Sequence, residues 1–126
     1  MKKLITILLP VLLAVFGTTA WAEGDTNVIV KGEHWVSSSL EQKRAFLFGI
    51  GNVLVIERAM AGDDYETMRG RSIVPVLLEG MSGTSIANIV TQLDKFYADH
   101  SDQINRPVIE VLYLEMALPN LQKMKE

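Results

Sequence analysis

The sequence has 126 residues, of which 48% are hydrophobic, and its 12 basic and 15 acidic residues give a formal net charge of −3. A chain of this length forms one domain with one modest core. The acidic balance and the lack of a Lys/Arg run make nucleic acid and anionic lipid head groups poor partners. The chain has no cysteine, which excludes disulfides, a thiol nucleophile and a zinc–cysteine site.

Residues 1–22 have the pattern of a secretory signal peptide. Two lysines precede a short apolar run, and an A-x-A site ending at Ala22 follows it. The run is shorter than the roughly 20 residues of a membrane span. We therefore expect cleavage after Ala22, a single helical domain over residues 23–126, and a periplasmic or secreted location without membrane attachment. Cleavage removes two of the 12 basic residues, which leaves 10 against 15 acidic ones and a net charge of −5.

The domain is expected to open with an extended lead-in over residues 23–38. Two capping-box spacings follow, Ser38 with Glu41 and Ser39 with Gln42, in which a hydroxyl and a carboxylate or amide can satisfy free backbone donors. This spacing predicts a helix from Leu40 to Met60. Trp35 lies just before the cap, and we expect it to fold back on the first turns as part of a hydrophobic staple.

The middle of this helix, residues 45–56, is apolar on every side except at Asn52. A helix of that kind is ordinarily buried, so we predict that it runs through the centre of the domain with other helices on several sides. Gly49 and Gly51 each cost about 1 kcal/mol relative to alanine in a helix interior. Close approach of a neighbouring helix is the expected compensation.

Three more helices are predicted after a polar connection. Ser72 can cap a short helix from Ile73 to about Gly80. Apolar residues spaced by three and four predict an amphipathic helix from Ile86 to about Asp99. A last helix covers Val108 to about Ala117 and is stopped by Pro119. The predicted fold is thus all-α, a compact bundle of about four helices around the central glycine-containing one.

Two carboxylates fall on apolar helix faces, Glu57 on the central helix and Glu115 on the last one. Desolvation favours the neutral form of such groups, which is one way to build an acid/base pair. Pairing with arginine is the favoured alternative, and four are available: Arg58, Arg69, Arg71 and Arg106. The candidate polar or ligand-binding cluster comprises Glu57, Glu115, Arg71, Tyr97 and Tyr113. No catalytic, metal or cofactor site is predicted, because the histidines and carboxylates lack ligand spacing.

Four motifs resemble those of small exported helical proteins of proteobacteria. They are Trp35 to Ser38, residues 43–47 running into Gly49, residues 93–97, and residues 106–108, which together span about residues 35–119. The chain is also similar in length, leader and helix order to the type VI secretion amidase immunity proteins. Those proteins bind and block a cell-wall amidase in the periplasm, and they commonly carry cysteines that this chain lacks.

The resemblance and the composition together favour a periplasmic protein-binding module that is not an enzyme, in one form an immunity-like inhibitor of an envelope enzyme. The alternative is a small-molecule or lipid binder that uses a cleft around Glu57, Glu115, Tyr97 and Tyr113. A hydrolase built on the two glutamates is a third hypothesis. The sequence leaves the oligomeric state open.

Overall fold

A computed structural model describes residues 29–126, so the signal peptide and its predicted cleavage site lie outside the described residues. The prediction of an all-α fold is confirmed for this part of the chain, where the β pairing recorded is an isolated bridge between Lys31 and Pro107. The elements are α1 Gly32–Ser37, α2 Leu40–Ala61, η1 Gly62–Met68, α3 Val74–Gly80, α4 Ile86–Asp99, η2 Ser101–Gln103, α5 Val108–Val111, η3 Leu112–Ala117 and α6 Leu118–Lys123.

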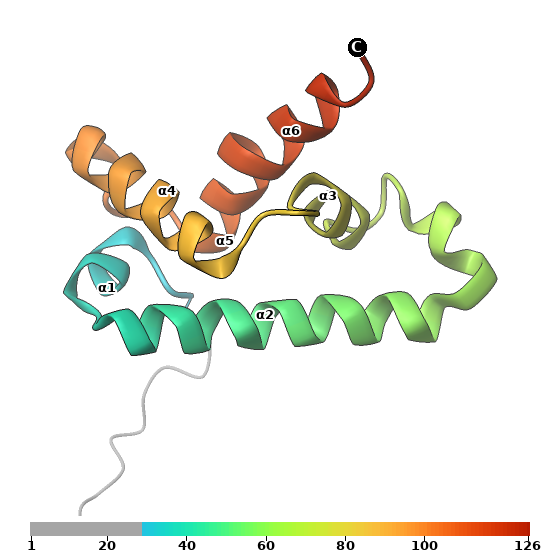
Figure 1. The fold of residues 1–126 in the computed structure, drawn as a ribbon, viewed down its shortest axis with the longest axis horizontal. Helices are drawn as coiled ribbons and strands as arrows, with labels where there is room; N and C mark the ends of the chain where they lie inside the picture. The colour runs from blue at the N-terminus through green and yellow to red at the C-terminus, as the bar shows by residue number, and fades with distance from the viewer. Residues whose placement is uncertain (1–28) are drawn as a thin grey trace, which may run out of the picture.

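Helix α2 lies along one side of the domain as a long rod, and the other helices all lie on the same side of it (Figure 1). Helices α1 and α4 sit over its N-terminal half, and α3 sits over its C-terminal half. The segment from α5 to α6 rises away from α2, so the C-terminus lies far from the rod. Among residues 29–126, no other helix covers the outer side of α2.

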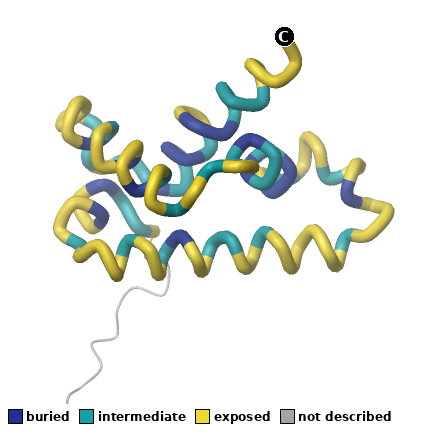
Figure 2. The backbone as a smooth tube through the Cα atoms, viewed as in Figure 1, coloured by how far each residue is buried: buried dark blue, intermediate teal, exposed yellow. Residues whose placement is uncertain are grey.

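The hydrophobic core lies beside α2 and not around it. Within residues 29–126, α2 contributes only Leu47 to the buried cluster, although it is the longest element (Figure 2). The other members come from α1, α3, α4 and the helical segment from α5 to η3: Trp35, Leu77, Val90, Leu93, Tyr97, Val108, Val111, Leu112, Met116 and Ala117.

The predicted burial of the Leu40–Met60 helix is therefore wrong. The 22 residues of α2 span about 33 Å, whereas α3 has only seven residues and covers about 10 Å. The shorter elements cover one narrow face of α2 and cannot surround it. Gly49 and Gly51 do not accommodate a neighbouring helix either, because a Cβ built on each of them meets nothing within 4 Å.

The extended lead-in is also corrected, because residues 32–37 form α1. This short helix is held from several sides. The Trp35 Nε1 atom donates a hydrogen bond to Asp94 Oδ1 at 2.8 Å, and the Gly32 amide donates to the Arg106 carbonyl at 3.1 Å. Tyr97 packs so closely on Gly32 that a Cβ there would overlap its ring. Tertiary contacts thus stabilise a helix that is too short to form alone.

The helix start predicted after Ser39 is confirmed, whereas α3 begins at Val74, one residue after the predicted start, with Ile73 and not Ser72 as its N-cap. The Ser39 hydroxyl accepts from the Gln42 amide at 3.2 Å, and the Gln42 side chain accepts from the Ser39 amide at 2.8 Å, which completes the capping box of α2. Ser72 accepts from the Val74 amide at 3.1 Å. These contacts depend only on neighbours in sequence, which is why the pattern alone predicts them.

Pro119 does not stop the last helix, which continues through η3 into α6 and ends at Lys123. Segment η3 is a π-helix, in which the Leu118 amide donates to the Tyr113 carbonyl, five residues back. This wider turn relieves the clash between a proline ring and the preceding turn that ordinarily ends a helix. The Asn120 side chain also fastens α6 to α3 by donating to the Gly80 carbonyl at 3.0 Å.

Gly80 is the glycine at which a close approach is tightest, since a Cβ there would overlap the backbone carbonyl of Ala117. We expect Gly80→Ala to lower the free energy of unfolding by about 1–3 kcal/mol, because one backbone must move away from the other. Gly51→Ala is the matched control in an open helical position and should raise it by up to about 1 kcal/mol. Urea unfolding measures both, and equal effects would contradict this packing.

Candidate functional site: the outer face of α2

The outer face of α2 is uncharged and exposed along most of its length. At about 100° per residue, nine residues lie between about 80° and 180° around the helix from Leu47, and all nine are exposed, although several also line the cavities on either side of α2. We call this set the α2 outer face: Ala45, Phe48, Gly49, Asn52, Val53, Val55, Ile56, Ala59 and Met60. Asn52 is its single polar member.

Large apolar side chains on this face are more than half exposed. The exposed fractions are 59% for Phe48, 60% for Val53, 58% for Val55, 57% for Ile56 and 79% for Met60. Single exposed apolar residues are ordinary on a protein surface, but contiguous patches mark sites that contact protein, membrane or ligand. The α2 outer face is such a patch, because its members follow one another along a single helix.

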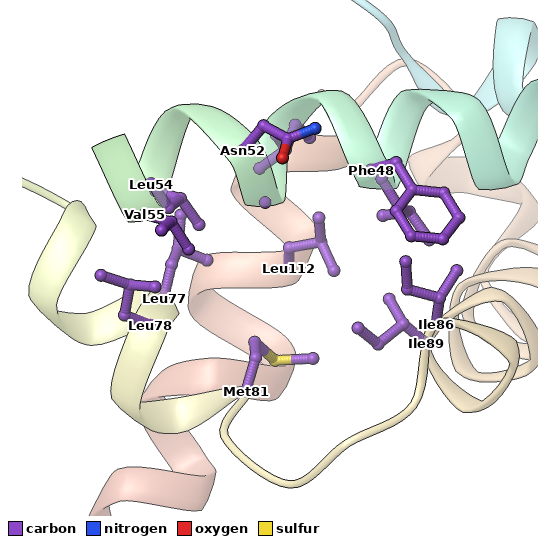
Figure 3. Close-up of a pocket in the computed structure, with 13 residues that line it drawn as sticks. Phe48, Asn52, Leu54, Val55, Leu77, Leu78, Met81, Ile86, Ile89 and Leu112 are labelled. Carbon is purple, nitrogen blue, oxygen red and sulfur yellow. The ribbon is translucent and has the colours of Figure 1, made fainter. Parts of the chain in front are cut away.

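Two cavities flank α2. The first has a volume of about 330 Å³ and opens between α2, α3 and the start of α4; Asn52 is the only residue with a polar side chain in its lining (Figure 3). The second, of about 500 Å³, lies on the other side of α2 and has only apolar lining residues. Ile50, Leu54 and Leu77 contribute to both. Helix α2 therefore meets the domain along a narrow ridge between two apolar grooves.

Polar and aromatic contacts hold the N-terminal end of α2. Asp94 on α4 accepts from Lys43 at 2.9 Å and from the Trp35 indole at 2.8 Å. The Trp35 and Phe46 rings pack edge to face with their centroids 6.3 Å apart. Three helices, α1, α2 and α4, thus meet at one carboxylate and one indole.

A second group of contacts holds the C-terminal end. The guanidinium of Arg58 lies 4.6 Å from the centre of the Tyr65 ring on η1. The Tyr65 hydroxyl lies 3.5 Å from Glu79 on α3, and Arg69 bridges Glu79 and Glu66. The helix is consequently fixed at both ends, with its uncharged middle presented to the outside.

The length of the uncharged segment argues against a membrane span. By length and composition alone, Leu40–Met68 could cross a bilayer, and only 6% of its most apolar stretch is buried. However, Arg44 and Glu57 bracket the uncharged residues 45–56. These 12 residues cover about 18 Å of helix, whereas the hydrocarbon core is about 30 Å thick.

The predicted polar cluster does not form around either cavity beside α2. Neither Glu57 nor Glu115 lines one of these cavities. Glu57 is exposed on α2, and Arg71 is exposed in the turn that follows η1. Glu115 is exposed as well, although a regular 100° step placed it on an apolar face. The π-helical turn of η3 changes that step and turns Glu115 toward Arg106.

Arg106 forms the ion pair that the arginine hypothesis favoured for Glu115. Its guanidinium donates to Glu115 Oε1 at 2.8 Å, to Glu110 Oε1 at 2.9 Å and to Gln103 Oε1 at 2.7 Å. The hydrogen bond to Glu115 raises the pKa of Arg106 above its ordinary value, and the bond to Glu110 adds to this effect. The cluster ties the loop before α5 to the α5–η3 helix, which is a structural role.

Tyr97 and Tyr113 belong to the core region. Tyr97 is buried, and its hydroxyl donates to the Arg106 carbonyl at 3.1 Å. Burial raises the pKa of Tyr97 to about 12. Tyr113 is half-buried and packs against the core cluster. Both residues therefore support the fold next to the Arg106 cluster. Neither of them lines the two apolar cavities beside α2.

Within residues 29–126, no group of three or more histidines and carboxylates is placed to hold a metal ion. The chain matches no protein-family model, no curated protein and no solved structure. The site must accordingly be interpreted from its own geometry.

The sequence reasoning missed the α2 outer face because it treated uniform apolarity as evidence of burial. One signal was available in the spacing of the residues. Ala45, Asn52 and Ala59 recur every seven positions, and Phe48 and Val55 follow at the intermediate positions. That is the spacing by which one helix packs along another.

The raised pKa of Tyr97 predicts that the free energy of unfolding falls at alkaline pH. The unfolded tyrosine loses its proton near its ordinary pKa of 10.0, whereas the folded one holds it until about 12. The unfolded state therefore binds fewer protons in this window, and stability present below pH 10 is lost as pH rises toward 12. Tyr97→Phe should cost about 1 kcal/mol at neutral pH through the lost hydrogen bond.

Above pH 10 the difference between the wild type and Tyr97→Phe should narrow, because only the wild type has this tyrosine to ionise. Urea unfolding of both proteins from pH 7 upward measures the difference. A difference that stays constant through pH 11 would contradict the assignment of the raised pKa to burial of Tyr97.

Proposed function

We propose that this protein is a non-catalytic protein-binding module of the periplasm and that it binds through the α2 outer face. The observation that carries the proposal is the exposed, uncharged row of large apolar residues on a helix that is fixed at both ends. Burial of such a face against a protein surface lowers the free energy of the complex. Because the helix is already held in place, little conformational entropy is lost on binding. In its finer form the module is an immunity-like inhibitor whose partner is an envelope enzyme.

The shape of the surface favours a protein over a small ligand. The face is the convex side of a helix about 33 Å long, with an apolar groove on either flank. Small-molecule sites are concave and carry a few convergent polar groups. A partner helix or loop can instead cover the ridge and fill the grooves at the same time.

A second candidate is an apolar small molecule or lipid chain in the cavity of about 330 Å³. Its volume lies at the lower end of the range for ligand pockets, and Asn52 offers a polar anchor at its edge. A cleft around Glu57, Glu115, Tyr97 and Tyr113 has less support, because neither cavity beside α2 is lined by any of the four, and a third cavity of about 400 Å³ is lined by Tyr97 alone among them.

Val55→Glu tests the α2 outer face, and Val36→Glu on α1 is its matched control. Both valines are helical, and their exposed fractions are 58% and 55%. A photoreactive phenylalanine analogue at Phe48 should capture a protein in living cells. We expect Val55→Glu to abolish this adduct, because a carboxylate in an apolar interface is costly, whereas Val36→Glu should leave it unchanged.

Neither substitution should change the free energy of unfolding by more than about 0.5 kcal/mol, since both side chains are more than half exposed and lie at the edges of open cavities. Loss of the adduct with unchanged stability would therefore report on binding and not on folding. An adduct that survives Val55→Glu, or none from Phe48 at all, would refute binding through this face. Mass spectrometry of the adduct then tests the inhibitor form.

A further inference from the structure

We propose that Met60 is a site of oxidation by hypohalous acids and peroxides, and that its sulfoxide prevents a partner from binding the α2 outer face. The inference rests on the proposed function, because it adds regulation to the proposed binding surface. Three observations support it: the exposure of the Met60 side chain, its place on the α2 outer face, and the lack of cysteine in the chain.

Met60 has the most exposed large apolar side chain among residues 29–126, with an exposed fraction of 79%. A dissolved oxidant therefore reaches its sulfur without any opening of the fold. The other methionines of this part of the chain differ in exposure. Met116 belongs to the core at 6%, Met68 and Met81 are half-buried, and Met124 is 70% exposed.

The composition of the chain directs oxidation to methionine. A cysteine thiolate is the side chain on which oxidants ordinarily act first, and this chain has no cysteine. Its sulfur atoms are consequently all thioethers. Exposure then decides which of them reacts fastest, and Met60 has the highest exposure on the surface proposed to bind.

The reaction removes two electrons from the Met60 sulfur. A sulfur lone pair attacks the chlorine of hypochlorous acid and displaces hydroxide, and water then replaces the chlorine on sulfur. The products are the sulfoxide, chloride and one proton, so sulfur is oxidised and chlorine is reduced. A peroxide transfers one oxygen in the same way and leaves as water or an alcohol. Methionine sulfoxide reductases restore the thioether, with two thiols oxidised to a disulfide.

A sulfoxide oxygen at residue 60 would be a strong hydrogen-bond acceptor on an otherwise uncharged, apolar surface. Ile56 lies one turn before Met60 on α2, and Glu57 offers a carboxylate, which accepts hydrogen bonds and donates none. A protein that covers this face would strip water from the sulfoxide, and these two neighbours on α2 offer it no donor in exchange. Burial of an unpaired polar group is unfavourable, so oxidation should weaken binding.

Met124 is an internal reference for Met60. The two side chains are similarly exposed, at 70% and 79%. Met124 follows α6 at the C-terminal end of the chain, which lies far from α2 (Figure 1). The same oxidant should therefore modify both residues, whereas only the change at Met60 alters the α2 outer face. Met60→Leu and Met124→Leu form a matched pair of variants, because leucine is apolar and resists these oxidants.

Peptide mass spectrometry of the purified mature protein measures the oxidation itself. With limiting hypochlorous acid, we expect Met60 and Met124 to gain an oxygen at rates within about threefold of each other and at least about tenfold faster than Met116. In urea that unfolds the protein, the three rates should converge. Oxidation of folded Met60 no faster than that of Met116 would overturn the inference.

The photoreactive analogue at Phe48 measures the effect on binding in living cells. Cells are treated with hypochlorous acid, quenched with free methionine and irradiated, and each protein is compared with its own untreated sample. The adduct should fall at least about fivefold in the wild type and in Met124→Leu, and clearly less in Met60→Leu. Oxidation of the partner lowers all three ratios alike, and a difference in basal binding cancels within each ratio.

Equal ratios for the wild type and Met60→Leu would overturn the inference and leave the proposed function standing. Protection by Met124→Leu to the same extent as by Met60→Leu would overturn it as well, because residue 124 lies away from the α2 outer face. Absence of an adduct in untreated wild-type cells would instead refute the proposed function, and the regulation of Met60 would fall with it.

Discussion

The structure depends on the burial of Trp35, whose side chain joins three helices at one point. Its ring fills the space between α1, α2 and α4, packs on Phe46, and donates to the same Asp94 oxygen that accepts from Lys43. Because Lys43 is charged and Asp94 is shared, the tryptophan, the lysine and the carboxylate form one coupled unit. This unit fixes the direction in which α2 leaves α1, and thereby the side of the domain on which its apolar residues are displayed.

Helix α2 is apolar in composition but largely exposed, and the contacts near its two ends explain how it is held in place despite this exposure. Most of the core comes from the other helices, and Leu93, Val108 and Val111, which are fully buried, lie on α4 and α5. Helix α2 supplies Leu47 and the partly buried row beside it. Its remaining apolar surface contributes nothing to the stability of the isolated chain, which is the physical reason to assign that surface to binding.

Local features of the fold could be predicted, and features that depend on the number of neighbours could not. The Ser39 cap and the start of α2 follow from residues within one turn of each other. Burial of residues 45–56 depends on how many helices surround them, and the composition of the segment does not determine that number. Pro119 and Glu115 were misplaced for a common reason, since both predictions assumed a regular α-helical turn where η3 has a π-helical one. Of the candidate site residues, only Glu115 found the arginine pairing that chemistry favoured.

Fixation of α2 at both ends has a consequence for amide hydrogen exchange. Resistance to local opening follows the density of buried contacts, which in α2 is highest at Leu47, Ile50 and Leu54, where the helix packs on the core. Residues 55–60 are all exposed, and Arg58 on the ring of Tyr65 is the contact recorded at that end. Exchange should therefore be fastest in the last turns of α2 and slowest in its middle, so the apolar residues from Val55 to Met60 are carried by the part of the helix that opens most readily.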